Sequence, residues 1–132
     1  MKHHDWEMLE LLLHKVQESA HVAYAPREYV AELVEARQAA GRDVGGNLDQ
    51  LKMQAADYEA LLVNNGFIEA RPEEQGGNGE NFILGPRGVR LLELIDSSLP
   101  AHLHCRQMLD AQGESALEPG VFDRIAAQAA RA

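Results

Sequence analysis

A short glycine-rich segment between two apolar runs restricts most strongly how this chain can fold. Gly76-Gly77-Asn78-Gly79 lies in a polar loop over residues 72–80, which separates Phe67-Ile68 from Asn81–Leu84. Because these loop residues tolerate positive φ angles, the pattern predicts a β-hairpin. Asn64-Asn65-Gly66, just before it, is typical of a helix end. The sequence therefore predicts a helix that leads directly into a small antiparallel hairpin.

Helix signals lie on both sides of this hairpin. Asp5 is expected to cap the first helix, Pro26 suits a first helical position, and Asn47 is a further N-cap. The spacing of apolar residues predicts helices over residues 5–18, 26–40, 48–53, 55–65 and 86–95, with Gly41 stopping the second. From Asn47 to Ile95 the order is helix, helix, hairpin, helix. That order is the order of a winged helix-turn-helix.

Length and composition fit one helix-rich domain. The 132 residues are enough to bury a core, and only 5% of them are aromatic. Low aromatic content favours helices packed on helices over a sheet-rich protein. Two more helices are expected, over Pro100–Gln112 and Pro119–Ala130. We therefore predict a helix-dominated α+β domain over residues 1–132, with a winged-helix core (1–96) and appended C-terminal helices (97–132).

Particular residues of this core carry a resemblance to a family. The chain begins Met1-Lys2-x-x-Asp5, its helix end reads Leu61-Leu62-Val63-Asn64-Asn65-Gly66-Phe67-Ile68, and Leu84–Leu92 follows the hairpin. These segments resemble a family of small bacterial and phage winged-helix-like proteins with no assigned activity. Tyr58, Gly85 and Val89 replace a histidine, a threonine and a second histidine of the family pattern. The resemblance covers about the first 96 residues and implies a fold, but no activity.

Charge separates two hypotheses about function. The chain has 12 Lys and Arg against 21 Asp and Glu, and its net charge is −9. Between Asn47 and Ile95, four basic and eight acidic residues give a net charge of −4. A protein that holds nucleic acid through phosphate contacts is expected to carry a basic face. The negative charge therefore argues against DNA binding, which the winged-helix order of elements favours.

The first hypothesis is a DNA-binding protein similar to transcriptional regulators, and it rests on architecture alone. Side chains that contact bases and phosphates are mainly Arg, Lys, Asn and Gln. The candidate DNA contacts are therefore Lys52, Gln54, Asn64, Arg71, Arg87 and Arg90. Arg87 and Arg90 could equally pair with Glu93 or Glu69.

The second hypothesis is an acidic protein-binding module. Such a module would steer toward a basic partner, for example by occupying the nucleic-acid site of a host protein as anti-CRISPR inhibitors from phage do. The candidate contacts are Asp57, Glu59, Glu73, Glu74 and Glu80. Both hypotheses are kept open.

The C-terminal segment adds a prediction about assembly. It carries apolar stripes that are not part of the minimal winged-helix core, namely Leu99, Leu103, Met108, Leu109, Val121, Phe122, Ile125 and Ala129. Large exposed apolar patches are uncommon on monomers, so a two-fold homodimer through these helices is expected. The alternative is that the stripes cover the domain's own core.

No pattern of residues predicts catalysis, a metal or a cofactor. Gly76-Gly77-Asn78-Gly79 lacks the Lys-Ser/Thr of a phosphate-binding loop, and no nucleophile elbow is present, so we do not expect an enzyme. In His102-x-His104-Cys105 the histidines are two apart and point to different sides of a helix. His3, His4, His14 and His21 fit no ligand spacing either.

The location expected from the sequence is the cytoplasm. The single cysteine, Cys105, suits a reducing compartment. The acidic start does not resemble a signal peptide, and no apolar run approaches the roughly 20 residues that span a bilayer. We therefore expect no membrane association.

Overall fold

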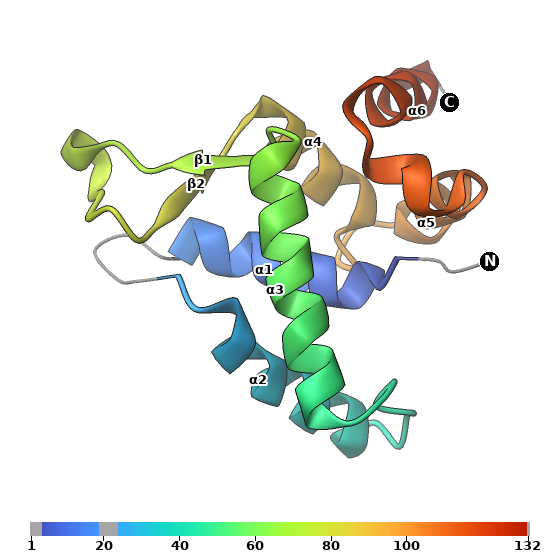
Figure 1. Cartoon of the computed structure of the whole chain (residues 1–132). Helices are drawn as coiled ribbons and strands as arrows, with labels where there is room; N and C mark the ends of the chain where they lie inside the picture. The colour runs from blue at the N-terminus through green and yellow to red at the C-terminus, as the bar shows by residue number, and fades with distance from the viewer. Residues whose placement is uncertain (1–3, 19–23, 132) are drawn as a thin grey trace.

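The computed structural model describes residues 4–18 and 24–131 (Figure 1). The helix-dominated α+β class is confirmed: these described residues form six α-helices and one antiparallel pair of short strands. In chain order the elements are α1 (Trp6–Glu18), α2 (Pro26–Ala39), α3 (Leu48–Asn64), β1 (Ile68–Ala70), the 3-10 turn η1 (Glu73–Gln75), β2 (Phe82–Leu84), α4 (Pro86–Ile95), α5 (His102–Asp110), the 3-10 turn η2 (Gly113–Leu117) and α6 (Pro119–Arg131).

Helix α1 lies at the centre of the fold, where it contacts α2, α3, α4 and β2. Its apolar side chains cover more than one side of the helix, as expected of a helix with neighbours on several sides. Asp5 caps it as predicted, because its Oδ1 accepts a hydrogen bond from the Met8 N–H at 3.0 Å. The buried side chains of α1 are Trp6, Met8, Leu9, Leu12, Leu13 and Val16.

Helix α3 differs from the prediction. We expected separate helices over 48–53 and 55–65, but residues 48–64 form one continuous helix. Its start is a capping box, in which Asn47 Oδ1 accepts from the Gln50 N–H at 2.8 Å and Gln50 Oε1 accepts from the Asn47 N–H at 3.1 Å. No glycine, proline or second cap interrupts the segment, and Gln54 and Ala55 both favour a helix. The predicted break therefore lacked a physical cause.

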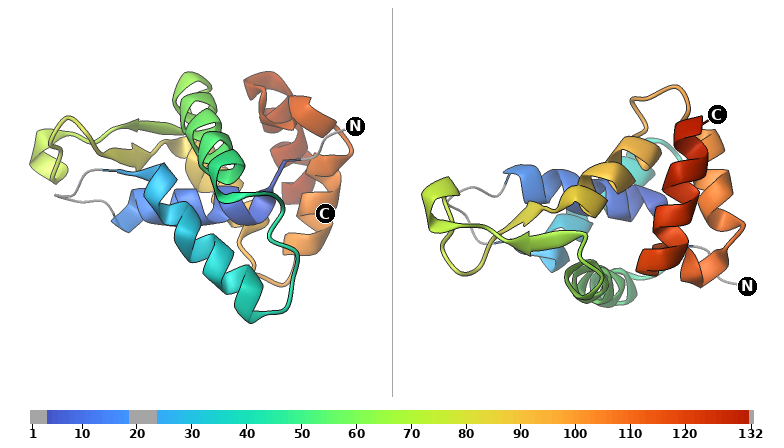
Figure 2. Two further views of the ribbon diagram at one scale, coloured as in Figure 1. Left: turned by 60° about the horizontal axis from the view of Figure 1, so that its bottom comes forward. Right: turned by 90° about the horizontal axis from the view of Figure 1, so that it is seen from above.

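The predicted hairpin is confirmed. Strand β1 pairs with β2 in antiparallel register, with Ile68 opposite Leu84 and Ala70 opposite Phe82. Gly66 ends the segment after α3 with φ of +77°, the left-handed conformation expected there. The buried Asn81 orders the loop, because its Nδ2 donates to the Gly76 carbonyl at 3.0 Å and its Oδ1 accepts from the Asn78 N–H at 3.0 Å. The hairpin extends from one end of the molecule (Figure 2).

Helices α5 and α6 pack at the opposite end (Figure 2). Leu109, Leu117, Phe122 and Ile125 are buried there, and the Phe122 ring meets the Phe67 ring edge to face at 5.0 Å. The C-terminal helices therefore cover the chain's own core, which was the alternative to a dimer interface. Among the predicted interface residues, Leu99 and Leu103 stay 40% and 64% exposed. The homodimer stays a prediction, but most of the side chains that motivated it are covered within one chain.

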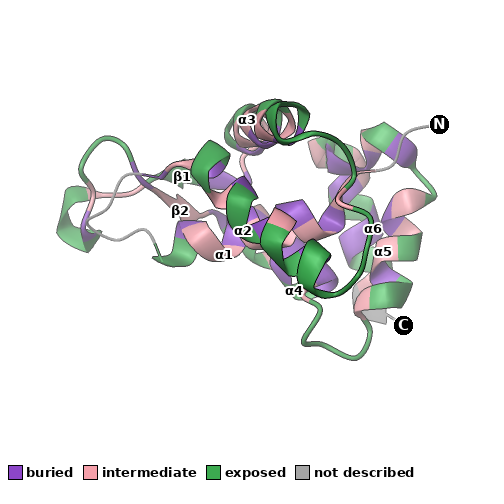
Figure 3. Cartoon of the chain, turned by 90° about the horizontal axis from the view of Figure 1, so that it is seen from below, coloured by how far each residue is buried: buried purple, intermediate pink, exposed green. Residues whose placement is uncertain are grey.

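A buried ion pair joins the start of α1 to the end of α2. Arg37 Nη2 lies 2.8 Å from both carboxylate oxygens of Asp5, and Arg37 Nη1 donates to the Val44 carbonyl at 2.7 Å. The Asp5 backbone N–H donates to the Tyr58 hydroxyl of α3 at 2.8 Å. Asp5 thus connects three helices. Figure 3 shows buried residues concentrated where these helices meet.

Replacing Arg37 tests how much this connection contributes to stability. Arg37→Met should lower the free energy of unfolding by about 3 kcal/mol, because it leaves the Asp5 carboxylate without its cation in a largely buried position. Urea unfolding followed by circular dichroism measures the change. Arg42→Met removes one of the two cations that pair with Glu7, in a more exposed ion pair, and should leave the unfolding midpoint nearly unchanged. Equal losses in the two variants would contradict the special role of Arg37.

A second prediction concerns the contact between α4 and the chain before β1. A Cβ added at Gly88 would lie 2.0 Å from the Phe67 carbonyl oxygen, so Gly88→Ala should cost at least about 2 kcal/mol of unfolding free energy. Gly120→Ala is the matched control, because a Cβ there meets open space within α6. It should be neutral or stabilising by up to about 1 kcal/mol, since alanine favours a helix over glycine. Thermal unfolding of both variants measures the difference.

Candidate binding groove

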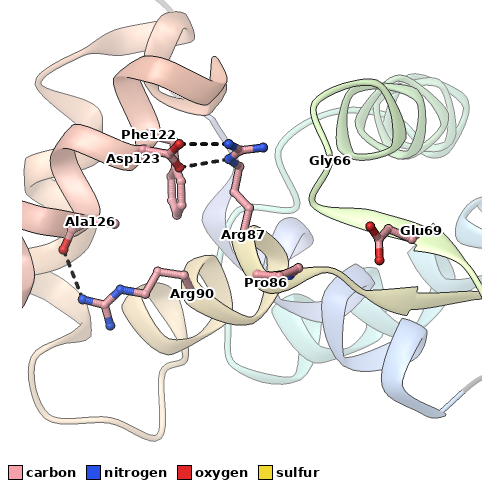
Figure 4. A pocket seen from close by; sticks show the side chains of 8 residues that line it. All are labelled: Gly66, Glu69, Pro86, Arg87, Arg90, Phe122, Asp123 and Ala126. Carbon is pink, nitrogen blue, oxygen red and sulfur yellow. Dashed lines mark hydrogen bonds and ion pairs between the residues drawn. The ribbon is translucent and has the colours of Figure 1, made fainter.

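Two of the candidate DNA contacts, Arg87 and Arg90, bind α6 (Figure 4). Arg87 donates from Nε and Nη2 to the Asp123 carboxylate at 3.0 and 2.9 Å, and from Nη1 to the Asn65 carbonyl at 2.9 Å. Arg90 Nη2 donates to the Ala126 carbonyl at 3.1 Å. The hydrogen bonds from Arg87 hold the pKa of Asp123 below its usual range. These contacts close one side of a cleft of about 600 Å3 and fasten α6 to α4.

The expected partners of these arginines are found in part. Arg90 Nη1 lies 3.5 Å from Glu93 Oε2, as one alternative predicted. Arg87 pairs with Asp123 instead of Glu69, although Glu69 lines the same cleft. Asp123 could not be predicted as the partner, because two further elements, α5 and η2, separate α6 from α4 in the chain.

A third candidate, Arg71, holds the hairpin. Its Nη2 donates to the Val16 carbonyl in the last turn of α1 at 3.0 Å, and its Nη1 donates to the Gln75 carbonyl at 3.3 Å. The guanidinium therefore binds backbone oxygens of η1 and of α1. It orients the hairpin against α1.

The remaining DNA candidates are on α3. Lys52 is half-buried and forms no ion pair with the residues that the structure describes. Gln54 Nε2 donates to the Tyr58 hydroxyl at 3.4 Å, and Asn64 is exposed at the end of the helix. Together with Arg71, Arg87 and Arg90, these residues do not form one basic face.

The candidate acidic contacts fall in three places. Glu73 and Glu74 are exposed on η1 at the hairpin, and Glu80 is exposed in the same loop. Asp57 is exposed on α3. Glu59 lies beside Tyr24, Pro26 and Arg27, where partial burial raises the pKa of its carboxyl group. The five acids therefore do not form one contact surface.

A different set of acids lines a groove along α3, which we call the acidic groove. One part of it has a volume of about 420 Å3, and the adjoining part, between α3 and η2, has about 600 Å3. Gln54 borders both parts, and among the described residues no Lys or Arg lines either of them. The lining residues are His4, Gln50, Met53, Gln54, Asp57, Tyr58, Leu61, Glu114, Ser115 and Glu118.

Hydrogen bonds connect the residues at the floor of the acidic groove. Burial raises the pKa of Tyr58, so its hydroxyl stays protonated and has a hydrogen to donate toward His4 Nδ1 at 3.4 Å. His4 Nε2 lies 3.0 Å from the Glu114 carbonyl oxygen, which requires the hydrogen on Nε2. One neutral tautomer of His4 satisfies both contacts. The ring therefore joins α3 to η2 at the base of the groove.

The carboxylates of the acidic groove lack a cationic partner among the residues that the structure describes. Asp57, Glu114 and Glu118 form no ion pair with the residues that the structure describes. Acids elsewhere do: Asp5, Glu7 and Glu32 each pair with a basic side chain. The groove thus combines uncompensated negative charge with apolar surface from Leu61 and from Met53, which is 63% exposed. This combination suits a cationic ligand that also has apolar parts.

Sequence reasoning missed Glu114, Glu118 and His4 as groove residues. Glu114 and Glu118 lie in and just after η2, a segment between two predicted helices that showed no pattern of its own. His4 is described, whereas His3 and His21, named beside it as conceivable ligands, are outside the described residues. Only the docking of η2 on α3 brings these side chains together, and no local signal reports it.

The histidines of α5 do not converge on a site. His102 Nδ1 lies 2.6 Å from the Leu99 carbonyl, His104 is exposed and Cys105 is buried. Within the described ranges, no helix combines the length and apolar character needed to cross a membrane.

Comparisons of the chain with protein-family models, curated proteins and solved structures found no match. The family resemblance seen in the sequence therefore stays a prediction.

The arginine contacts of α4 generate a prediction. Arg87→Gln removes the two bonds to Asp123 and should raise amide hydrogen exchange in α6 about fivefold, since a partly exposed pair contributes about 1 kcal/mol. Arg124→Gln is the control, because Arg124 is exposed on α6 and forms no ion pair within the described chain. Mass spectrometry of exchange, with α1 as an internal reference, measures both variants. Unchanged protection of α6 in Arg87→Gln would refute this role.

Proposed function

We propose that this protein is a protein-binding module of winged-helix architecture, which binds a basic segment of a partner protein in the acidic groove. The observation that carries the proposal is the groove itself. Between α3 and η2 the groove holds Tyr58 and the carboxylates of Glu114 and Glu118, and its adjoining part on α3 adds Asp57 and the exposed Met53. None of these three acids forms an ion pair with a described residue. An arginine or lysine of the partner would pair with Glu114 and Glu118, and its neighbours would contact Met53 and Leu61.

The element order supports the winged-helix part of the proposal. Three helices precede a hairpin, and the hairpin leads into α4, so a helix lies on each side of the wing as expected, although the two helices expected over 48–53 and 55–65 are the single helix α3. The pair α2 and α3 takes the place of the helix-turn-helix. Its connection, residues 40–47, is longer than the usual turn of three or four residues. α3 is thus the helix that would face a ligand.

The exposed side of α3 favours a protein ligand over DNA. A helix that enters the major groove is expected to present donors such as arginine to bases and phosphates. The exposed positions of α3 include Asp49, Met53, Asp57, Ala60 and Val63, and Lys52 is the only basic residue of the helix. The negative side chains there would repel phosphates, and together with the apolar ones they fit a basic protein surface that also has apolar parts. An inhibitor of a nucleic-acid-binding protein is one form that such a module would take.

Selection from a displayed library of random peptides tests the proposal. Immobilised protein should enrich peptides in which arginine or lysine flanks an aliphatic or aromatic residue. The affinity of an enriched peptide is then measured by fluorescence anisotropy. The double variant Glu114→Lys/Glu118→Lys should weaken binding at least about tenfold, because it replaces attraction by repulsion at the groove.

The control variant is Glu73→Lys/Glu74→Lys, which makes the same change in net charge at the hairpin. At physiological salt the Debye length is about 8 Å, so distant charges are screened and affinity should stay within about twofold. Equal weakening by the two double variants would mean that only net charge matters. Binding of duplex DNA with a clear salt slope, together with no enriched peptide, would overturn the proposal in favour of DNA binding.

A further inference from the structure

Three side chains with metal-binding atoms meet where α1 passes the end of α4. Glu10 and His14 are one turn apart on α1, and Asp96 directly follows α4. His14 Nε2 lies 3.8 Å from Glu10 Oε2 and 3.7 Å from Asp96 Oδ2. One ligand atom from each of the three residues lies within 4.8 Å of the other two. None of these residues belongs to the acidic groove.

The neighbours of the two carboxylates fix their positions. Asp96 Oδ1 accepts hydrogen bonds from the Ser98 N–H at 2.9 Å and the Ser98 hydroxyl at 2.7 Å, which leaves Oδ2 toward His14. Glu10 Oε1 accepts from Arg106 Nη2 at 3.2 Å. Glu10 Oε2 accepts from the N–H and the hydroxyl of Ser97 at 2.8 and 3.0 Å. Bonds of this kind orient the ligands of protein metal sites.

We propose that Glu10, His14 and Asp96 form a binding site for a divalent transition metal ion of the zinc class. One imidazole nitrogen and two carboxylate oxygens are ligands that such ions accept, with metal–ligand distances near 2.1 Å. Tetrahedral geometry then requires ligand atoms about 3.4 Å apart, which is within about half an ångström of the separations to His14 Nε2. Small side-chain rotations would close this difference.

Binding requires one rearrangement of hydrogen bonds. Glu10 Oε2 would keep the bond from the Ser97 N–H and give its other lone pair to the metal, and the exposed Ser97 hydroxyl would turn to solvent. Three protein ligands leave at least one coordination position for water or an external ligand. Asp96 also lines a cleft of about 170 Å3 beside Gln17 and Glu93, so solvent reaches the side of the site next to α4.

The competing explanation is a purely electrostatic cluster, in which a protonated His14 bridges the two carboxylates. The two explanations differ in what Zn2+ does. A metal site binds Zn2+ near neutral pH with one ion per chain and changes the chemical shift of His14 Nε2 directly. A cluster held only by a proton shows neither effect.

Titration of the metal-free full chain with Zn2+ tests the site. We expect calorimetry to give a stoichiometry of one, and 15N-detected imidazole spectra to show a large shift confined to His14. His14→Gln should weaken Zn2+ binding more than tenfold, and Asp96→Asn about tenfold. Both residues are partly exposed, so the variants should fold, and circular dichroism checks this.

His104→Gln is the matched control, because it removes an exposed histidine from α5 without touching the three ligands. It should leave the affinity unchanged, as should His3→Gln, which tests for binding by the histidines near the start of the sequence. Absence of Zn2+ binding at millimolar concentration would overturn the proposal. So would binding that persists in His14→Gln. Neither result bears on the acidic groove, which is tested separately.

Discussion

The carboxylate and backbone of Asp5 hold together the helices on which the rest of the structure is built. The side chain caps α1 and binds Arg37 of α2, and the N–H binds Tyr58 of α3. A charged pair in this position is stable only while every partner is present, because an unpaired buried charge is costly. The placement of α3, and therefore of the acidic groove, depends on this connection between helices distant in sequence.

Signals that act over a few residues predicted much of this fold. The Asp5 cap, the stop at Gly66 and the hairpin around Gly76–Gly79 are set by local backbone preferences, and each is present. The break predicted after Met53 was wrong because neither glycine, proline nor a cap supported it. Apolar stripes located the C-terminal helices, but the sequence did not decide whether their cover came from this chain or another.

The candidate sites lay beyond such local reasoning. The acidic groove needs η2 to dock on α3, and the ligand set at His14 needs Asp96 from the end of another helix. The spacing of residues along the chain predicts neither the docking of η2 on α3 nor the position of Asp96 beside His14. The arginines show the reverse case: residue type suggested phosphate contacts, whereas Arg71 and Arg87 bind carbonyl and carboxylate oxygens of their own chain. The acidic composition opposed a nucleic-acid partner, but only tertiary contacts bring the residues of the acidic groove together.

The anchoring of the hairpin has a consequence for recognition. Two three-residue strands alone would be a marginal structure in water. Here Arg71 fastens the hairpin to α1, and the Tyr24 N–H donates to the Glu80 carbonyl at 3.0 Å, so the loop is attached to the segment before α2 as well. The hairpin is therefore ordered before any contact is made, and little conformational entropy is left for it to lose on binding.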